Sequence, residues 1–205
     1  MSRFDKIHLV SQSPRRRELL RQIGVTAEVI LLRSAPGRPA DVDETPHPGE
    51  DPQAYSLRVA RAKAEAGWRH ARARRLPTLP VLGADTVVVL DGDILGKPAH
   101  QEEAIEVLRR LSGRSHQVLT AVAVGFDGQL ETRLSVSTVC FRALEEAEIR
   151  RYAASGYPLD KAGSYGIQGR AAAFVTNLNG SYSGVMGLPL HETAELLQRF
   201  EVEFG

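Results

Sequence analysis

The sequence predicts an α/β fold in which helices flank a mixed, twisted β-sheet. Strand and helix patterns alternate at the beginning of the chain, and strand patterns then cluster between residues 78 and 144, where one helix pattern separates them. The chain has 205 residues, enough to bury a hydrophobic core, and its apolar content of 42% is typical of a globular protein. We therefore expect a single domain over residues 1–205.

The first elements are expected to be a strand, a helix and a second strand. KIHLVS (6–11) is a short apolar run typical of a buried strand. The helix predicted over 13–25 has Ser13 at a favourable N-cap position and Pro14 at the first helical position, where proline is well tolerated. TAEVILL (26–32) predicts the second strand.

A long loop separates this region from a central helix and hairpin. Residues 33–52 are rich in Pro, Gly and Asp, which favours an irregular loop, and loops of this length are often functional. An alanine-rich helix is expected over about 51–75. Residues 78–98 contain a buried strand and a short return strand, joined at Asp91-Gly92, a pair that favours a tight hairpin turn.

The second half of the chain is expected to combine long strands with helices and one glycine-rich loop. In order, we predict a helix at 100–113 closed by Gly113, two long strands within 115–144 that meet at Asp127-Gly128, a helix at 145–156, a glycine-rich loop at 163–169, a strand and turn at 172–190 and a final helix at 189–204.

The composition gives little sign of a polyanionic or membrane partner. Lys and Arg total 26 against 25 acidic residues, so any attraction to phosphate must be local. The single cysteine, Cys140, excludes an intramolecular disulfide. No apolar run approaches the roughly 20 residues that span a bilayer, and the apolar stretch near the N-terminus is too short for a signal peptide. We expect a cytoplasmic protein with no membrane partner.

The segment SQSPRRRELL (11–20) is a candidate anion site. Unpaired backbone N–H groups at a helix start attract anions, and Ser11, Ser13, Arg15 and Arg16 would add hydroxyl and guanidinium donors suited to phosphate oxygens. A solvated basic helix face is the alternative, although the strand–turn–helix context favours a ligand. The segment is not a P-loop, because GxxxxGK[ST] does not occur in the chain.

Asp85 stands out because it interrupts the apolar strand VLGADTVVVL, with Thr86 beside it. A buried carboxylate is costly unless it is paired or binds a metal, so Asp85 is a candidate metal ligand or general base. A carboxylate that only accepts hydrogen bonds from nearby backbone N–H groups is the alternative.

Other polar residues are weaker candidates when each is taken alone. The acids of DVDET (41–45) suit Mg²⁺ or Mn²⁺, although solvated loop acids would look the same. Lys63 and Lys97 are single lysines, of which Lys97 is more suggestive because it follows a glycine at a strand end. Gln168 lies in the glycine-rich loop, where its amide offers a donor and an acceptor to a pyrimidine base or simply faces solvent. The arginine-rich WRHARARR (68–75) fits a solvated helix end.

Taken together and in this order, these segments resemble the Maf family of nucleoside triphosphate pyrophosphatases. The resemblance rests on SQSPRRRELL, DVDET, RVARAKA, GADTVV, GKP, LSGRSHQVLTAVAV, PLDKAGSYGIQG and NGSYSGVMGLPLHET, which cover most of the chain. PLDKAGSYGIQG is similar to the subgroup that hydrolyses dTTP and UTP. The subgroup that acts on 7-methyl-GTP tends to carry a Cys in place of Lys161 and Ser-Glu in place of Ile167-Gln168. The loop at 33–42 is longer than the family pattern, which leaves the register of the loop acids open.

The resemblance implies a fold with two lobes around a central cleft, like inosine triphosphatases, and cleavage between the α- and β-phosphates of dTTP, UTP and modified pyrimidine nucleotides. It implies Asp85 as the general base and a divalent cation, Mg²⁺ or Mn²⁺, held by Glu44 and Asp85. Three residues match positions linked to substrate choice, namely Arg15, Thr86 and Gln168. Four match phosphate-contacting positions, namely Ser11, Arg16, Lys63 and Lys97. A homodimer and a house-cleaning role in nucleotide metabolism follow from the same resemblance.

Two alternatives remain at this point. The first is the same hydrolysis of a different nucleotide, such as 7-methyl-GTP. The second is a non-catalytic regulator of cell division that binds a nucleotide or nucleic acid through the arginines at 15–17. The second alternative gives no role to Asp85 in its apolar strand, and we expect no stable nucleic-acid partner.

Overall fold

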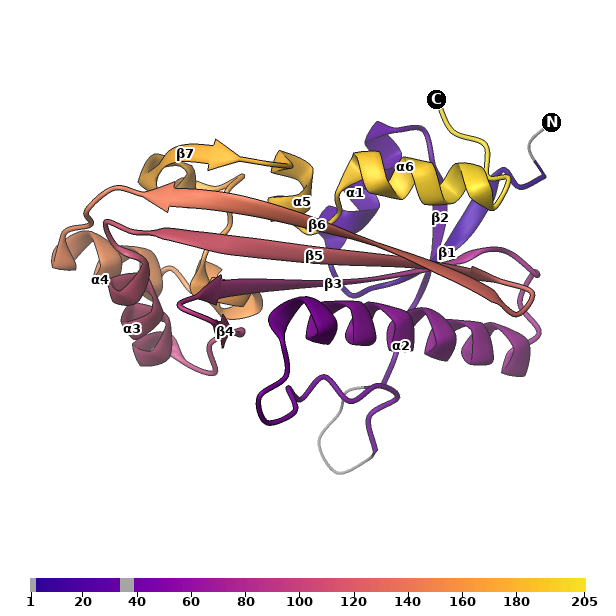
Figure 1. Ribbon diagram of the computed structural model, residues 1–205, viewed down its shortest axis with the longest axis horizontal. Helices are drawn as coiled ribbons and strands as arrows, with labels where there is room; N and C mark the ends of the chain where they lie inside the picture. Colours follow the sequence, from indigo (N-terminus) through magenta and orange to yellow (C-terminus); the bar gives the residue numbers. More distant parts are fainter. Residues whose placement is uncertain (1–2, 34–38) are drawn as a thin grey trace.

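The computed structural model describes residues 3–33 and 39–205 and contains one seven-stranded mixed sheet with helices on both faces (Figure 1). Residues 34–38, part of the loop expected at 33–52, lie outside the described residues. The strands are β1 (Lys6–Val10), β2 (Thr26–Ile30), β3 (Val81–Leu90), β4 (Asp93–Leu95), β5 (Ser115–Phe126), β6 (Gln129–Phe141) and β7 (Val175–Asn179).

The strand order β2-β1-β3-β5-β6-β7 joins a parallel part to an antiparallel part. β1 is parallel to both β2 and β3, whereas β5, β6 and β7 are antiparallel to their neighbours, and β4 pairs with β3 as a hairpin. The predicted mixed α/β sheet is therefore confirmed. Both hairpin turns were located correctly, because Asp91-Gly92 and Asp127-Gly128 have positive φ at each residue, as tight turns of this kind require.

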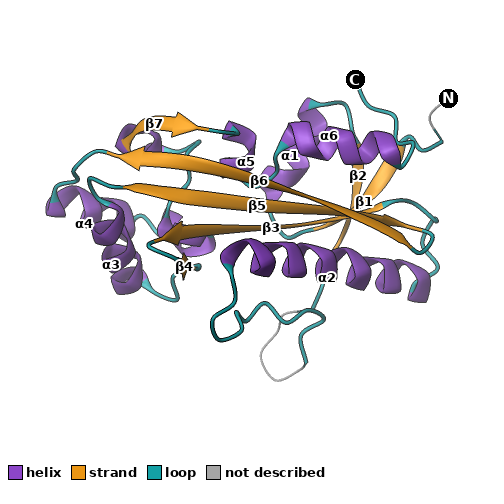
Figure 2. Ribbon diagram, in the orientation of Figure 1, coloured by secondary structure: helices purple, strands orange, loops and turns teal. Residues whose placement is uncertain are grey.

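The helices differ from the sequence-based boundaries mainly near the C-terminus (Figure 2). They are α1 (Pro14–Gln22), α2 (Pro52–Ala73), α3 (Gln101–Leu111), α4 (Glu146–Ala154), α5 (Tyr182–Met186) and α6 (Leu190–Arg199), with short 3₁₀ turns η1 (Tyr157–Asp160), η2 (Ala162–Ser164) and η3 (Arg170–Phe174).

Three expected boundaries were wrong for identifiable reasons. The last helix does not continue to residue 204, because the backbone of Glu201 and Glu203 pairs with Phe4 at the start of the chain. The expected turn within 172–190 contains α5, at whose start the Ser181 hydroxyl accepts a hydrogen bond from the Gly184 N–H. The second strand ends at Ile30 rather than at residue 32, because its pairing with β1 ends at Val10.

Two hydrophobic cores form on the same face of the sheet, one toward each end of β3. The first packs Leu82 and Ala84 of β3 under α1 and α6, with Leu20 and Leu196 among its buried residues. The second packs Val88 and Leu90 of β3 under α3 and α4. These cores give the two lobes that were expected, and residues 85–87 of β3 lie between them.

The sheet edge is open at this position. β1 pairs with β3 only at Val81–Gly83, and β4 pairs with the same edge only at Val88–Leu90. Within the described residues, no strand pairs with positions 84–87 on that edge, while β5 covers the opposite edge throughout. The gap leaves Asp85 and Thr86 accessible from one side although the strand around them is buried.

Gly83 allows α2 to pack directly on β3 beside this gap. A Cβ atom at Gly83 would lie 2.6 Å from the backbone nitrogen of Ala64 and 2.7 Å from the carbonyl oxygen of Ala60. Both atoms belong to the backbone of α2, so they cannot move without displacing the helix. This close approach places Lys63 of α2 next to Asp85.

We expect Gly83→Ala to lower the free energy of unfolding by about 1–3 kcal/mol, because the added methyl group overpacks the contact between α2 and β3. Urea denaturation measures the change. Gly125→Ala is the matched control in β5, where an added Cβ would meet its neighbours only at 3.5 Å or more and should cost little. Equal stability of the two variants would contradict the close-packing explanation.

Candidate functional site

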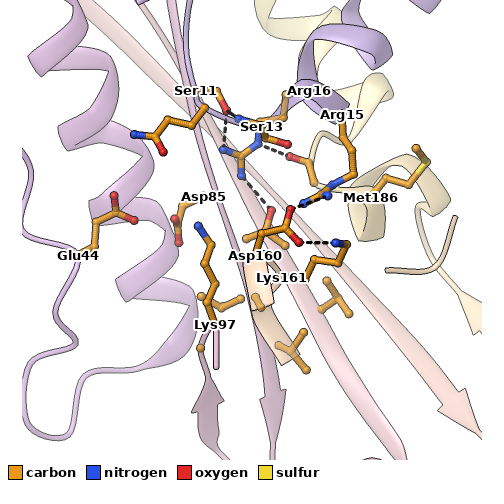
Figure 3. Close-up of a pocket in the computed structure, with 18 of the residues that line it drawn as sticks. Ser11, Ser13, Arg15, Arg16, Glu44, Asp85, Lys97, Asp160, Lys161 and Met186 are labelled. Atoms are coloured by element: carbon orange, nitrogen blue, oxygen red, sulfur yellow. Dashed lines mark hydrogen bonds and ion pairs between the residues drawn. The ribbon is translucent and has the colours of Figure 1, made fainter. Parts of the chain in front are cut away.

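A cleft of about 620 Å³ opens over the gap in the sheet edge and contacts both lobes (Figure 3). All nine residues to which the family resemblance gave a role line it, although they come from six separate segments. They are Ser11, Arg15, Arg16, Glu44, Lys63, Asp85, Thr86, Lys97 and Gln168. Arg17, the third arginine of the opening helix, is exposed and does not line the cleft.

Asp85 forms an ion pair with Lys63 at the base of the cleft. The Asp85 side chain is 10% exposed, and its Oδ1 lies 2.8 Å from the Lys63 ammonium. Its Oδ2 is buried and has no hydrogen-bond partner among the residues that the structure describes. One oxygen is therefore neutralised by the protein, and the other is left for a group that enters the cleft.

Glu44 is the acid of the 41–45 segment that the structure places in the cleft. Its Oε2 lies 2.8 Å from the same Lys63 ammonium, so one lysine bridges Glu44 and Asp85. Asp43 instead accepts a hydrogen bond from the Thr45 backbone, and Asp41 pairs with Arg33 and His70. Neither Asp41 nor Asp43 lines the cleft.

Two side chains of α2 hold the Glu44 segment in place. The Tyr55 hydroxyl donates to the Glu44 carbonyl at 2.8 Å, and Arg58 donates to the carbonyls of Asp43 and Thr45. Three consecutive carbonyls are thus bound from one helix. Burial, together with the charges of Asp85 and Glu44, raises the pKa of Tyr55, so its hydroxyl stays protonated and remains a donor.

The start of α1 presents Arg15 and Arg16 to the cleft, but the Ser13 side chain does not cap the helix. The Ser11 hydroxyl accepts a hydrogen bond from the Ser13 N–H instead. The Arg16 guanidinium donates to the Gly187 carbonyl at 2.8 Å and to the Thr86 hydroxyl at 3.3 Å. Burial lowers the pKa of Arg16 from its very high ordinary value, against the opposing effect of Asp85 and Glu44.

A second ion pair crosses the cleft from α1 to η1. Arg15 lies 3.4 Å from Asp160, whose other oxygen binds the buried Lys161 ammonium. Lys161 also donates to the Tyr157 carbonyl and lies 3.6 Å from the centre of the Tyr157 ring. Although partial burial opposes the effect, bonds from Lys161 and Arg15 lower the pKa of Asp160. Arg15 therefore faces the cleft while held by a carboxylate of the other lobe.

Lys97 and Gln168 differ from the other predicted cleft residues in their lack of polar contacts with the described part of the chain. Neither makes a hydrogen bond or ion pair with other residues that the structure describes. Lys97 is exposed after β4, and Gln168 is half-buried at the end of the glycine-rich loop. Both can therefore bind a ligand without first breaking a contact of the protein.

Sequence reasoning missed several residues that line the cleft. Asp160 was not considered, and Lys161 was noted only as a difference between subgroups, although adjacent opposite charges before a glycine-rich loop could have drawn attention to both. The apolar lining could not be found from the sequence, because Val88, Val118 and Met186 look like ordinary core residues. Gly187 contributes a carbonyl, which no sequence pattern indicates.

The described residues contain no cluster of three or more His, Cys, Asp or Glu side chains that could hold a metal ion. The cleft nevertheless brings Glu44 and Asp85 within reach of one cation, as their shared contact with Lys63 shows. Two carboxylates together with substrate phosphates are the usual ligands of Mg²⁺ in nucleotide enzymes. The orphaned Oδ2 of Asp85 fits such a ligand set.

Comparison with known proteins identifies the family. The model of the family described as Maf-like protein matches residues 6–200. The chain belongs to this family. A Nitrosomonas europaea protein named dTTP/UTP pyrophosphatase is 57% identical over 94% of this chain and 93% of its own length. A protein of the same name from Aromatoleum aromaticum is 56% identical over 95% of each chain.

A solved structure, that of the Staphylococcus aureus Ham1 protein, matches this Maf-like chain with a TM-score of 0.45 and 16% identity, covering 95% and 97% of the two chains. This similarity is too low to bear on function. Among the described residues, no helix is long and apolar enough to cross a membrane.

The glycine-rich loop of this Maf-like chain rests on a buried aromatic cluster. Tyr165 lines the cleft and pairs through its hydroxyl with His116 of β5 at 2.8 Å, while Phe141 packs edge-on against both rings. The Gly166 N–H donates to the Tyr152 hydroxyl. Burial lowers the pKa of His116 to about 4, so the ring is neutral under ordinary conditions.

The pKa of His116 is lower in the folded chain than its ordinary value of 6.5, so folding favours the neutral ring. The contribution of His116 to stability is therefore fully present above pH 6.5 and is lost as the pH falls toward 4. The loss attributable to this residue should reach about 3 kcal/mol. We expect His116→Gln to flatten the dependence of unfolding free energy on pH in this window, measured by urea denaturation at several pH values. The exposed His191, replaced in the same way, is the control. A slope that His116→Gln leaves unchanged would refute the assignment.

Proposed function

We propose that this chain hydrolyses dTTP and UTP to the nucleoside monophosphate and pyrophosphate. The observation that carries the proposal is that Arg15, Arg16, Lys63 and Lys97 line the same cleft as the buried carboxylate of Asp85. A triphosphate is a dense negative charge, and cations from several segments neutralise it better than one flexible patch. The names of the relatives at 52–57% identity support the same reaction.

A divalent cation, Mg²⁺ or Mn²⁺, completes the proposed site. Glu44 and Asp85 would hold it together with phosphate oxygens of the substrate. When bound, such an ion neutralises phosphate charge and lowers the pKa of coordinated water. The protein contributes the Asp85 carboxylate, which is held in strand β3, and the Glu44 carboxylate, which projects from a backbone segment that Tyr55 and Arg58 hold.

Asp85 is the proposed general base. The oxygen of a water molecule attacks the α-phosphorus, the bond from that phosphorus to the bridging oxygen breaks, and pyrophosphate leaves with the bonding electrons. The proton of the water passes to the Asp85 carboxylate. Arg15, Arg16 and Lys97 lie where they can stabilise the charge on the phosphates.

The base is proposed to lie between the glycine-rich loop and the apolar lining of the cleft. The Gln168 amide can accept a hydrogen bond from N3–H of uracil or thymine and donate one to a ring carbonyl. The two bases share this edge, which accounts for the use of both UTP and dTTP. Cytosine has no N3–H, so the same amide would be left with an unsatisfied group. Modified pyrimidines that keep the edge should also be substrates.

The proposed reaction is tested by assaying pyrophosphate release from a panel of nucleoside triphosphates, 7-methyl-GTP included, with Mg²⁺ or Mn²⁺. We expect dTTP and UTP to be the best substrates. Asp85→Asn should lower kcat by about 10²–10⁴-fold while UTP still binds, because the amide cannot take a proton. A variant with near-normal kcat would show that Asp85 is not the base. A preference for 7-methyl-GTP would overturn the substrate assignment.

Gln168→Ala should loosen the choice of base more than it slows hydrolysis of UTP. The ratio of kcat/KM for UTP to that for CTP should fall about tenfold, since one unsatisfied hydrogen bond costs about 1–3 kcal/mol. The same steady-state assay with both nucleotides measures the ratio. Gln198→Ala, an exposed position on α6, is the control. An equal loss for all bases would mean that Gln168 does not recognise the base.

A homodimer and a cytoplasmic location stay predictions that rest on the family resemblance and the composition. The absence of a stable nucleic-acid partner has the same status.

A further inference from the structure

Lys63 occupies the position of a cation between the two acidic side chains of the cleft. Its ammonium lies 2.8 Å from Glu44 Oε2 and 2.8 Å from Asp85 Oδ1, and the side chain is 13% exposed. The first carbon of the side chain packs over Gly83, where an added Cβ would lie 3.1 Å away. The base of the side chain is therefore fixed by α2 and β3, while the ammonium sits at the end of four flexible bonds.

A divalent cation that ligates the same two oxygens, Glu44 Oε2 and Asp85 Oδ1, cannot share them with this ammonium. A metal ion that ligates both oxygens must approach each to about 2.0–2.6 Å, which is the region that the Lys63 nitrogen now fills. Two positive charges at that separation also repel each other strongly in a partly buried site. The metal can ligate these two oxygens only after the ammonium leaves one or both of them, and a metal held by the other carboxylate oxygens still lies close to the ammonium charge.

The two acids differ in their freedom to allow this exchange. Asp85 is buried in β3 and keeps its position, whereas the Glu44 side chain is 53% exposed and can rotate. Lys63 has no third acidic partner among the described residues, so its charge must be satisfied elsewhere once it is displaced. The phosphates of a bound nucleotide would supply oxygens within the same cleft.

We propose that Lys63 is a built-in counter-ion that competes with the divalent cation for Glu44 and Asp85 and moves to the triphosphate when metal and nucleotide enter together. This inference rests on the proposed function, because it takes Glu44 and Asp85 as the metal-binding acids. In the free protein the lysine neutralises the two carboxylates and weakens metal binding. Nucleotide and metal then bind cooperatively, because the nucleotide gives the displaced lysine a new partner.

The test is the affinity of the protein for Mn²⁺ alone, without nucleotide, measured by the electron paramagnetic resonance signal of free Mn²⁺. We expect Lys63→Met to bind Mn²⁺ at least about fivefold more tightly than the natural chain, since the competing charge is gone. Lys63→Arg keeps a cation and should bind Mn²⁺ no more tightly than the natural chain. Unchanged or weaker binding by Lys63→Met overturns the proposal.

Three controls separate competition from other effects. Lys97→Met removes a cleft lysine that makes no ion pair with the described residues and should tighten Mn²⁺ binding much less; an equal effect would mean that only the overall charge matters. Lys6→Met removes a paired lysine outside the cleft and should change nothing. Thermal unfolding confirms that each variant is folded, and Lys63→Gln replaces Lys63→Met if the latter is not.

Asp85→Asn distinguishes failure of this inference from failure of the proposed function. If Asp85→Asn weakens Mn²⁺ binding but Lys63→Met does not strengthen it, the metal site stands and the competition is refuted. If Asp85→Asn leaves Mn²⁺ binding unchanged, the proposed metal site itself is wrong, and the inference fails with it.

Discussion

The buried carboxylate of Asp85 is the constraint on which the rest of the site depends. Nine of the ten residues of β3 are buried, and a carboxylate in such a strand is strongly disfavoured unless a cation neutralises it. Lys63 supplies that cation, and it can do so only because Gly83 lets α2 lie against the backbone of β3. A feature of helix packing thus decides whether the central charge of the cleft is tolerated.

The same strand also explains why the cleft lies where it does. A strand that paired with β3 along its whole length on the side of β1 and β4 would cover Asp85 and leave no access for a ligand. The pairing of β1 with β3 instead ends at Gly83, and the pairing with β4 starts at Val88. The segments that follow these strands carry Ser11 and Lys97, so the ends of the two neighbours bring functional side chains to the opening. The ends of β1 and β4 therefore produce both the open edge of β3 and part of the polar lining of the cleft.

Much of this arrangement could be predicted from the sequence, because local signals agree with the tertiary structure. The Asp-Gly pairs located both hairpin turns, and the buried Asp85 marked the site through its energetic cost alone. The family resemblance then selected residues as scattered as Glu44 and Gln168. What could not be predicted depends on contacts between distant segments. The end of α6 is set by pairing with Phe4, and the backbone of the Glu44 segment is held by Tyr55 and Arg58 of α2.

The charges of the cleft are balanced in a way that a simple anion site would not need. Six basic and three acidic side chains line it. Each of the three carboxylates binds a cation of the protein: Asp160 holds Arg15 and Lys161, and Lys63 holds both Glu44 and Asp85. A site that only attracted phosphate would bind it more tightly without these acids.

The acids hold several cations of the cleft in place before a ligand arrives. A polyanion that binds to these cations therefore replaces the carboxylates as their partner. Such exchange lowers the affinity for any single phosphate. It also favours a ligand that brings a metal for the carboxylates and several phosphates for the released cations, and a nucleoside triphosphate with its metal ion satisfies both conditions.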